Sequence, residues 1–483
     1  MTNSFFSRKS VLINILIILF HSILIAIIYS RYQGSFCYYL FFTISTILML
    51  IIAITGVIKL FELFFVIYLW LGFWFKYSIN IILNRELFWE VKEESFNWLV
   101  IDGVLYKCSL VFLIISLLLL ISKFINFPSN SLFASKRKNL STFYKRNRFF
   151  ILFLYFIFVL SIASSNLYYG IYQRGFGPST ILPFGLNLIY PLLLLIMIPT
   201  LSAIIVQAEI DSKLEAINSG FLIQILESLL TNISILSRGM IVIPASQLIG
   251  IVLTGKVFNK VKFALMAMTL IITFSGSVIA VNYFRISLFG SSLASGENNI
   301  FTKYNKTKIL DDNKIAIIPS LLFDRWVGIE GMVAVDNINN RGLALWYKFW
   351  QDKLEYGKLG TYDREIINSP YWDIEKSEGK KHSVSLPGAI AFLYVSDSFL
   401  IVIAGLFIIF IVGNTFEFLS ILASNNNILY IAFVCQVVAY RFAQFGYAPS
   451  NSWNLFCSII ISLIIIFLSY KLINSLIRFK VDD

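Results

Sequence analysis

Long apolar runs, each close to the length that crosses a lipid bilayer, dominate this chain. A transmembrane helix needs about 20 mostly apolar residues. Two runs are weaker than the rest, because 217–236 carries Gln224 and Glu227 and 240–255 is short and contains Pro244. The runs predict an all-α, polytopic membrane protein of about 12 transmembrane helices, at 11–29, 36–54, 60–83, 104–123, 149–167, 181–206, 217–236, 240–255, 262–281, 386–413, 428–446 and 453–473.

Composition and charge agree with a lipid bilayer as the main partner. Hydrophobic residues make up 58% of the 483 residues and charged residues only 14%, whereas soluble domains carry about 25% charged residues. The net charge of +12 does not imply nucleic acid, because membrane proteins concentrate Lys and Arg in cytosolic loops. The largest basic block, 136–148, is accordingly interpreted as a topology anchor beside anionic lipid.

The charge pattern predicts the topology. With a cytosolic N-terminus, the basic residues of the loops assigned to the cytosol far outnumber those of the short loops on the other side, as the positive-inside rule requires. Both termini are then cytosolic and the protein is multi-pass in the cytoplasmic (inner) membrane. The predicted organisation is nine helices in 1–281, an exoplasmic loop subdomain in 282–385 and three helices in 386–483.

The predicted exoplasmic subdomain is nearly balanced in charge and rich in Trp, Leu and Ile, so it is expected to be folded. Apolar residues recur at helical spacing in 318–333 and again in 343–354. These stretches predict short amphipathic helices that lie on the membrane surface or cap the spans.

Common enzyme signatures are absent. The chain has no G-x-x-x-x-G-K-[ST], no H-E-x-x-H and no G-x-S-x-G. All four cysteines lie inside apolar runs and there are only two histidines, so no metal or other cofactor is expected. Any chemistry must depend on arginines, acidic residues, one histidine and the aromatic residues of the large loop.

Four arginines on the predicted outer side form the candidate binding site. Arg174 lies in a glycine-containing loop, Arg238 opens a span in Ser-Arg-Gly, Arg325 belongs to the large loop, and Arg441 falls within an apolar span. Guanidinium groups bind phosphate oxygens in a bidentate fork, so the four together suit a lipid pyrophosphate.

Each arginine also has a structural interpretation. Arg174 and Arg238 could extend to lipid headgroups, and Arg325 could pair with its neighbour Asp324 or with Glu330. Arg441 could extend to the headgroups or pair with Asp397, although an ionisable residue within a span is by default a hypothesis of function.

Candidate catalytic and sugar-binding residues lie in the same loop. His382, just before the tenth predicted span, could act as general base in its neutral form, with Glu330 as the alternative; a plain surface histidine is the structural interpretation. The tryptophans could stack on sugar rings, or anchor the loop at the membrane interface: Trp326, Trp346, Trp350 and Trp372.

The chain resembles the Wzy-type O-antigen polymerases, the oligosaccharide repeat-unit polymerases related to the O-antigen ligases. The resemblance is carried by Ser-Arg-Gly at 237–239 opening a span, by the single long outer loop between two late spans, and by His-Ser at 382–383 leading into Pro387, Gly388 and a span that contains Gly405. Its architecture covers nearly the whole chain, while the motifs are short.

The resemblance implies a membrane glycosyltransferase of polysaccharide and lipopolysaccharide biosynthesis. Undecaprenyl-pyrophosphate-linked oligosaccharide repeat units would be joined at the outer face of the cytoplasmic membrane without metal. A lipid-linked oligosaccharide is then the substrate partner, with a chain-length regulator as an optional further one. The arginines would stabilise the leaving pyrophosphate, and His382 or Glu330 would take the proton of the acceptor hydroxyl.

Two other classes fit the spans. A lipid-linked oligosaccharide flippase or another multi-span transporter fits the helix number, but such proteins generally lack a folded outer loop of this length, and no inverted repeat of broken spans is evident. A structural membrane protein is the third class.

Overall fold

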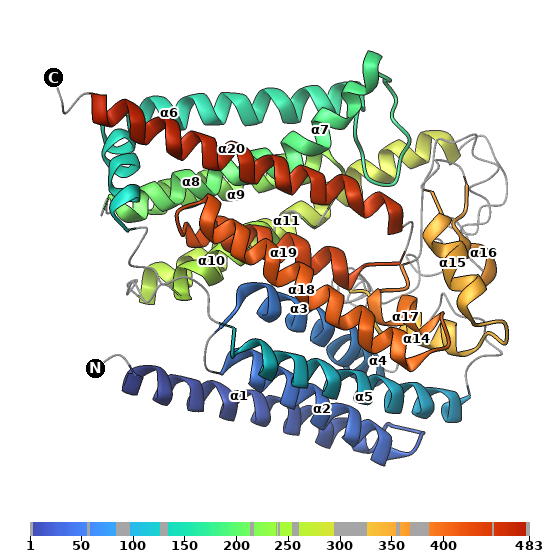
Figure 1. Cartoon of the computed structure of the whole chain (residues 1–483). Helices are drawn as coiled ribbons and strands as arrows, with labels where there is room; N and C mark the ends of the chain where they lie inside the picture. The colour runs from blue at the N-terminus through green and yellow to red at the C-terminus, as the bar shows by residue number, and fades with distance from the viewer. Residues whose placement is uncertain are drawn as a thin grey trace.

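The computed structural model describes a helical bundle (Figure 1). Its described part comprises residues 3–55, 58–83, 97–125, 134–212, 217–237, 239, 242–253, 260–293, 326–353, 358–367, 386–446 and 449–479. Within these ranges the ordered elements are all helices, with no β-strand. The prediction of an all-α protein is therefore confirmed.

Nine helices or helix series of the described part are long and apolar enough to cross a membrane. Three further apolar helices are shorter: α9 (Ile217–Ser234), α10 (Val242–Leu253) and α19 (Ile428–Ala443). The count of twelve requires that these three also cross, and it stays a prediction. The nine are formed by α1 (Asn3–Tyr29), α2 (Phe36–Ile54), the series α3–η1–α4 (Leu60–Leu69, Trp70–Phe75, Lys76–Ile82), α5 (Trp98–Ser122), α6 (Ala134–Tyr169), the series η4–α7–η5–α8 (Pro183–Leu188, Ile189–Leu192, Leu193–Met197, Ile198–Asp211), α11 (Lys260–Leu293), α18 (Phe399–Ala423) and the pair η7–α20 (Pro449–Asn451, Ser452–Phe479).

The first and last helices share one end of the bundle. Helix α1 begins and α20 ends at this end, whereas α15 (Leu343–Gln351) and α16 (Thr361–Glu365) lie at the opposite end (Figure 1). This arrangement is what an even number of crossings produces. The assignment of the first end to the cytosol remains a prediction.

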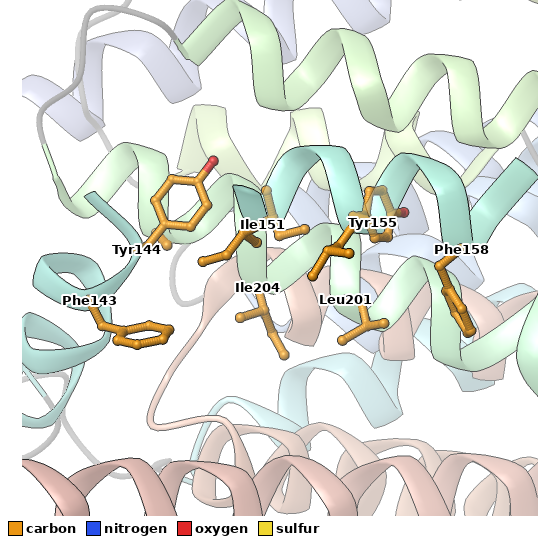
Figure 2. Close-up of a pocket in the computed structure, with 10 residues that line it drawn as sticks. Phe143, Tyr144, Ile151, Tyr155, Phe158, Leu201 and Ile204 are labelled. Carbon is orange, nitrogen blue, oxygen red and sulfur yellow. The ribbon is translucent and has the colours of Figure 1, made fainter. Parts of the chain in front are cut away.

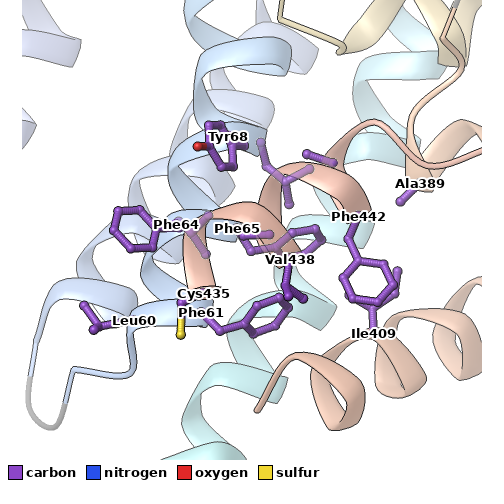
Figure 3. Close-up of a cluster of buried hydrophobic side chains, with 14 of the residues drawn as sticks. Leu60, Phe61, Phe64, Phe65, Tyr68, Ala389, Ile409, Cys435, Val438 and Phe442 are labelled. Carbon is purple, nitrogen blue, oxygen red and sulfur yellow. The ribbon is translucent and has the colours of Figure 1, made fainter. Parts of the chain in front are cut away.

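The centre of the bundle is the contact between α3 and α19 (Figure 3). Phe61 and Phe65 of α3 are fully buried and meet the ring of Phe410 of α18 edge to face. The hydroxyl of Tyr68 accepts a hydrogen bond of 2.8 Å from the amide of Gln436. Large aromatic rings thus fill the space between these helices, and one polar bond sets their register.

The segment that follows residue 325 enters the bundle instead of lying on its surface. Helix α14 (Ile329–Asp336) is buried along most of its length. A Cβ added to Gly72 would lie 1.9 Å from the carbonyl oxygen of Val327, and one added to Gly331 would lie 2.0 Å from that of Pro387. Glycines therefore let this backbone touch its neighbours. Of the first predicted amphipathic stretch, 318–333, the part up to residue 325 lies outside the described residues. The rest is buried in the bundle and does not lie on its surface, and the alternative that it caps the spans stays a prediction.

The second amphipathic helix forms as α15, but another face of it is buried. Leu345 and Phe349 are covered, while Leu343 and Trp350, which the spacing assigns to the apolar face, are 60% and 38% exposed. Phe392 of α17 (Ala389–Tyr394) contacts Phe349 on this stripe and also Trp346 and Trp350 on the predicted one.

The tenth predicted span, 386–413, is wrong in its bounds. The short, buried helix α17 ends at Tyr394, and the membrane-spanning helix α18 starts only at Phe399. Between them Asp397 has a φ of +54°, a left-handed conformation that Asp tolerates better than most residues and that ends a helix. Hydropathy alone does not detect such a break, since apolar residues continue on both sides.

Candidate functional site

Arg441 lies near the end of α19 and holds the start of α20. Its Nε and Nη2 atoms donate to the Ser452 hydroxyl, at 2.9 and 2.7 Å. No carboxylate of the described residues forms an ion pair with this guanidinium group; Asp397, weighed as its partner from the sequence, lies 3.6 Å from Arg341 instead. Two hydrogen bonds use two of the five guanidinium donors, so Arg441 retains capacity for an anion.

Arg174 joins two loops at the same end of the bundle. Its backbone amide donates to the carbonyl of Ile235 at 2.9 Å, and its Nη1 donates to the Ser237 hydroxyl at 3.3 Å. Gly239 is adjacent, since a Cβ built there would lie 3.9 Å from the same Nη1. The loop after α6 is thereby tied to the loop between α9 and α10.

The structure brings Arg174 and Arg441 together. The two positive charges are close enough to repel each other, and Tyr172 lies within electrostatic reach of both. Tyr440, the residue before Arg441, is close to Arg174 as well. Two like charges in a partly buried place cost free energy that a bound anion would offset. This pair, with its tyrosines, has the chemistry of an anion site.

Aromatic residues connect the arginine pair to the large loop. The ring of Trp326 stacks on Tyr68 at 5.9 Å, and Tyr68 meets Tyr440 at 5.2 Å. Tyr68 therefore links Trp326 to Tyr440, the residue that precedes Arg441. Its own carbonyl accepts a hydrogen bond of 3.1 Å from Lys76, which fixes the loop backbone against α4.

A second aromatic cluster contains Trp346 and Trp350, the other two candidate sugar-binding tryptophans that the structure describes. Trp350 packs edge to face on Phe392 and Phe445, with ring centroids 5.2 and 5.7 Å away, and Trp346 packs on Phe392 at 5.9 Å. Trp350 remains 38% exposed. It can present ring surface to a ligand, whereas the Trp346 indole nitrogen is enclosed without a hydrogen-bond partner.

Glu330 is engaged in an ion pair with Lys76. The pair is largely covered, with side-chain exposures of 16% and 9%. It joins α14 to α4 and helps to hold the segment that follows residue 325 in the bundle. This carboxylate therefore has a structural role. The assignment of Glu330 as general base stays a prediction.

The remaining candidates lie outside the described residues: Arg238, Arg325, His382 and Trp372. Residues next to the first two are described, and they belong to the site above. Ser237 accepts the hydrogen bond from Arg174, and Trp326 stacks on Tyr68.

Three residues of the site were not singled out from the sequence: Tyr172, Tyr440 and Ser452. The two tyrosines stand two residues before Arg174 and one before Arg441, so inspection of the arginines' neighbours could have found them. Ser452 belongs to the next helix, and only the fold places it beside Arg441.

Comparisons of the chain with protein-family models, with curated proteins and with solved structures gave no match. Among the described residues, no group of three or more His, Cys, Asp or Glu side chains could hold a metal ion.

Proposed function

We propose that this protein is a membrane glycosyltransferase that joins oligosaccharide repeat units carried on undecaprenyl pyrophosphate. The reaction would take place at the end of the bundle that holds Arg174 and Arg441, which the charge pattern assigns to the outer face. The acceptor hydroxyl attacks the anomeric carbon, the bond from that carbon to the pyrophosphate oxygen breaks, and a base takes the hydroxyl proton.

The observation that carries the proposal is the proximity of Arg174 and Arg441. Charge develops on the pyrophosphate as the glycosidic bond breaks, and preorganised cationic donors stabilise it. A guanidinium group can offer two parallel hydrogen bonds to phosphate oxygens. Because Arg441 has a hydroxyl partner and no carboxylate among the described residues, its charge is available for such an anion.

The aromatic residues support a glycan as the rest of the ligand. Trp326 lies near the arginines and Trp350 is partly exposed at the same end of the bundle. Flat ring surfaces beside an anion site suit a sugar attached to a phosphate. In this proposal His382 is the first choice for the base, since Glu330 is already paired with Lys76.

The proposal is tested by the length distribution of the surface glycan. Deletion of the gene should leave single repeat units and abolish the ladder of longer chains. Complementation with Arg441→Lys should restore little of the ladder, because a point charge does not reproduce the bidentate fork. Arg364→Lys is the matched control, as Arg364 lies on the exposed side of α16, and it should restore the ladder fully.

Other outcomes identify other functions. Accumulation of single repeats on the cytosolic leaflet would make the protein a flippase, and an unchanged ladder would exclude both activities. A normal ladder with His382→Ala would move the base role to Glu330 or another carboxylate and leave the polymerase proposal standing.

A further inference from the structure

Polar side chains follow the interface between α6, α8 and α9 through the bundle. At one end Glu209 accepts hydrogen bonds from Arg148 at 3.0 Å and from Tyr144 and the Gly220 amide at 2.9 Å each. At the other end the amide of Asn166 donates to the backbone carbonyl and the hydroxyl of Ser234, at 3.0 and 2.9 Å. Both ends of the interface are thus well hydrogen-bonded.

The middle of this interface holds a carboxyl group that lacks hydrogen-bond partners. Glu227 of α9 is 2% exposed. Its Oε1 has only the Thr231 hydroxyl at 3.5 Å, and its Oε2 has no hydrogen-bond partner. One turn earlier, Gln224 donates to the Ser202 hydroxyl at 3.3 Å, while its own carbonyl oxygen is buried without a partner. Two acceptor oxygens on one face of α9 therefore lack a donor.

Glu227 lies deep in the apolar part of the bundle. It interacts with Tyr155, which stands near the middle of the candidate span Thr142–Tyr169. The Tyr155 hydroxyl donates to the carbonyl of Ile198, near the middle of the span formed by η4 to α8. At this depth an ionised carboxylate without a partner costs far more free energy than a neutral carboxylic acid.

Among the side chains that the structure describes, no base faces Glu227 from the elements packed around it. On α6 and α8 the facing titratable group is the Tyr155 phenol, and the charged pair Arg148–Glu209 lies at the end of the interface. Helix α10 contains no titratable residue, and Tyr283, the one titratable residue among the described side chains of α11, is 71% exposed. A proton is the simplest donor that satisfies this carboxyl group.

We propose that Glu227 is an intramembrane proton-binding site, which exchanges its proton with water along the polar interface of α6, α8 and α9. The unpaired oxygens of Glu227 and Gln224 and the hydroxyls of Ser202 and Thr231 supply the partners that a transient water needs. Buried carboxyl groups of this kind serve as proton relays in membrane proteins. The site is independent of the arginine pair.

A groove lies beside Tyr155 (Figure 2). It lies between α6 and α8, has a volume of about 340 Å³, and is lined mainly by apolar side chains such as Leu201 and Ile204. The ring of Tyr155 forms part of its wall. An apolar reagent that enters this groove would meet Tyr155, which interacts with Glu227.

Infrared spectroscopy of the purified full-length protein tests the proposal. The difference between the wild type and Glu227→Gln should contain the C=O band of a protonated carboxyl group at low pH. The band should shift in D2O and disappear as the pH rises. Absence of the band at every pH would overturn the proposal, as would a band that neither shifts in D2O nor titrates, because that carboxyl group would be sealed. Loss of the band on adding Na⁺ at constant pH would assign the site to a metal cation and also overturn it.

A second measurement needs no variant. Dicyclohexylcarbodiimide adds to protonated carboxyl groups in apolar surroundings, and peptide mass analysis locates the adduct. We expect the adduct on Glu227, with a yield that falls as the pH rises. Glu209 is the internal control, because it is ion-paired with Arg148 and accepts two further hydrogen bonds, and it should stay unmodified. An unmodified Glu227, or equal modification of both residues, would contradict the proposal.

Discussion

Replacement of Gly72 by Ala should be among the most damaging single-methyl changes in this protein. Gly72 lies in the π-helical turn η1, and its added Cβ would lie 1.9 Å from the Val327 carbonyl oxygen and 2.8 Å from the Val327 carbonyl carbon. Both are backbone atoms, so no side-chain rotation relieves the overlap. Ordinary Cβ contacts begin near 3.4 Å, and the two backbones would have to separate by more than 1 Å, roughly, to restore one.

The overlap created by Gly72→Ala should lower the free energy of unfolding substantially. Overpacking a well-packed core costs about 1–3 kcal/mol, and here the movement would also loosen α14 and the covered ion pair between Lys76 and Glu330. We therefore expect a loss of at least about 3 kcal/mol in the free energy of unfolding. The measurement is unfolding of the purified protein in mixed micelles, followed by tryptophan fluorescence.

Gly103→Ala is the matched control for Gly72→Ala. Gly103 is also a helical glycine in a spanning helix, but its added Cβ would meet nothing within 4 Å. Replacing it should be neutral or stabilise the protein by roughly 0.5–1 kcal/mol, because Ala favours the helix over Gly. If Gly72→Ala unfolds like the wild type and like Gly103→Ala, the close contact between η1 and the segment after residue 325 is wrong.

Three further predictions concern topology, capping and the ligand. Cysteine probes should react with an impermeant reagent from outside at position 358 and not at position 140, and the reverse pattern would invert the predicted topology. Glu417→Gln should lower the free energy of unfolding by about 1–2 kcal/mol, because Glu417 accepts hydrogen bonds from the Leu60 and Phe61 amides at 3.0 and 2.9 Å; unchanged denaturant unfolding would exclude this role. Trp350→Ala should shorten the glycan ladder and Trp350→Phe should largely restore it, whereas equal ladders for both would remove Trp350 from the sugar site.

The helical class could be predicted from the sequence because hydropathy measures a property of each segment by itself. Runs of about 20 apolar residues have few other stable forms in lipid. The bounds of the tenth span could not be predicted, because the break at Asp397 is a backbone conformation within apolar surroundings. The burial of α14 depends on contacts of Gly72, Gly328 and Gly331 with distant parts of the chain. Such contacts leave no pattern in the local sequence.

Part of the candidate site could also be predicted from the sequence. Arg441 stands out because a charged residue within an apolar run is rare, and Arg174 because of its polar, glycine-containing loop. Their proximity is a tertiary property, created where the loop after α6 meets the ends of α9 and α19. The engagement of Glu330 by Lys76 likewise joins residues far apart in the sequence, so the sequence offered no sign of it.

The central claim is that the arginine pair binds the pyrophosphate of a lipid-linked glycan during its transfer. The most direct test uses purified protein in vesicles that contain only lipid-linked repeat units, with product length read by gel. The wild type should form longer chains without added metal or nucleotide, and Arg441→Lys should slow elongation by about 10²–10³-fold, as loss of one well-placed oxyanion donor does. Elongation by Arg441→Lys at the wild-type rate, or no elongation by the wild type, would contradict the account.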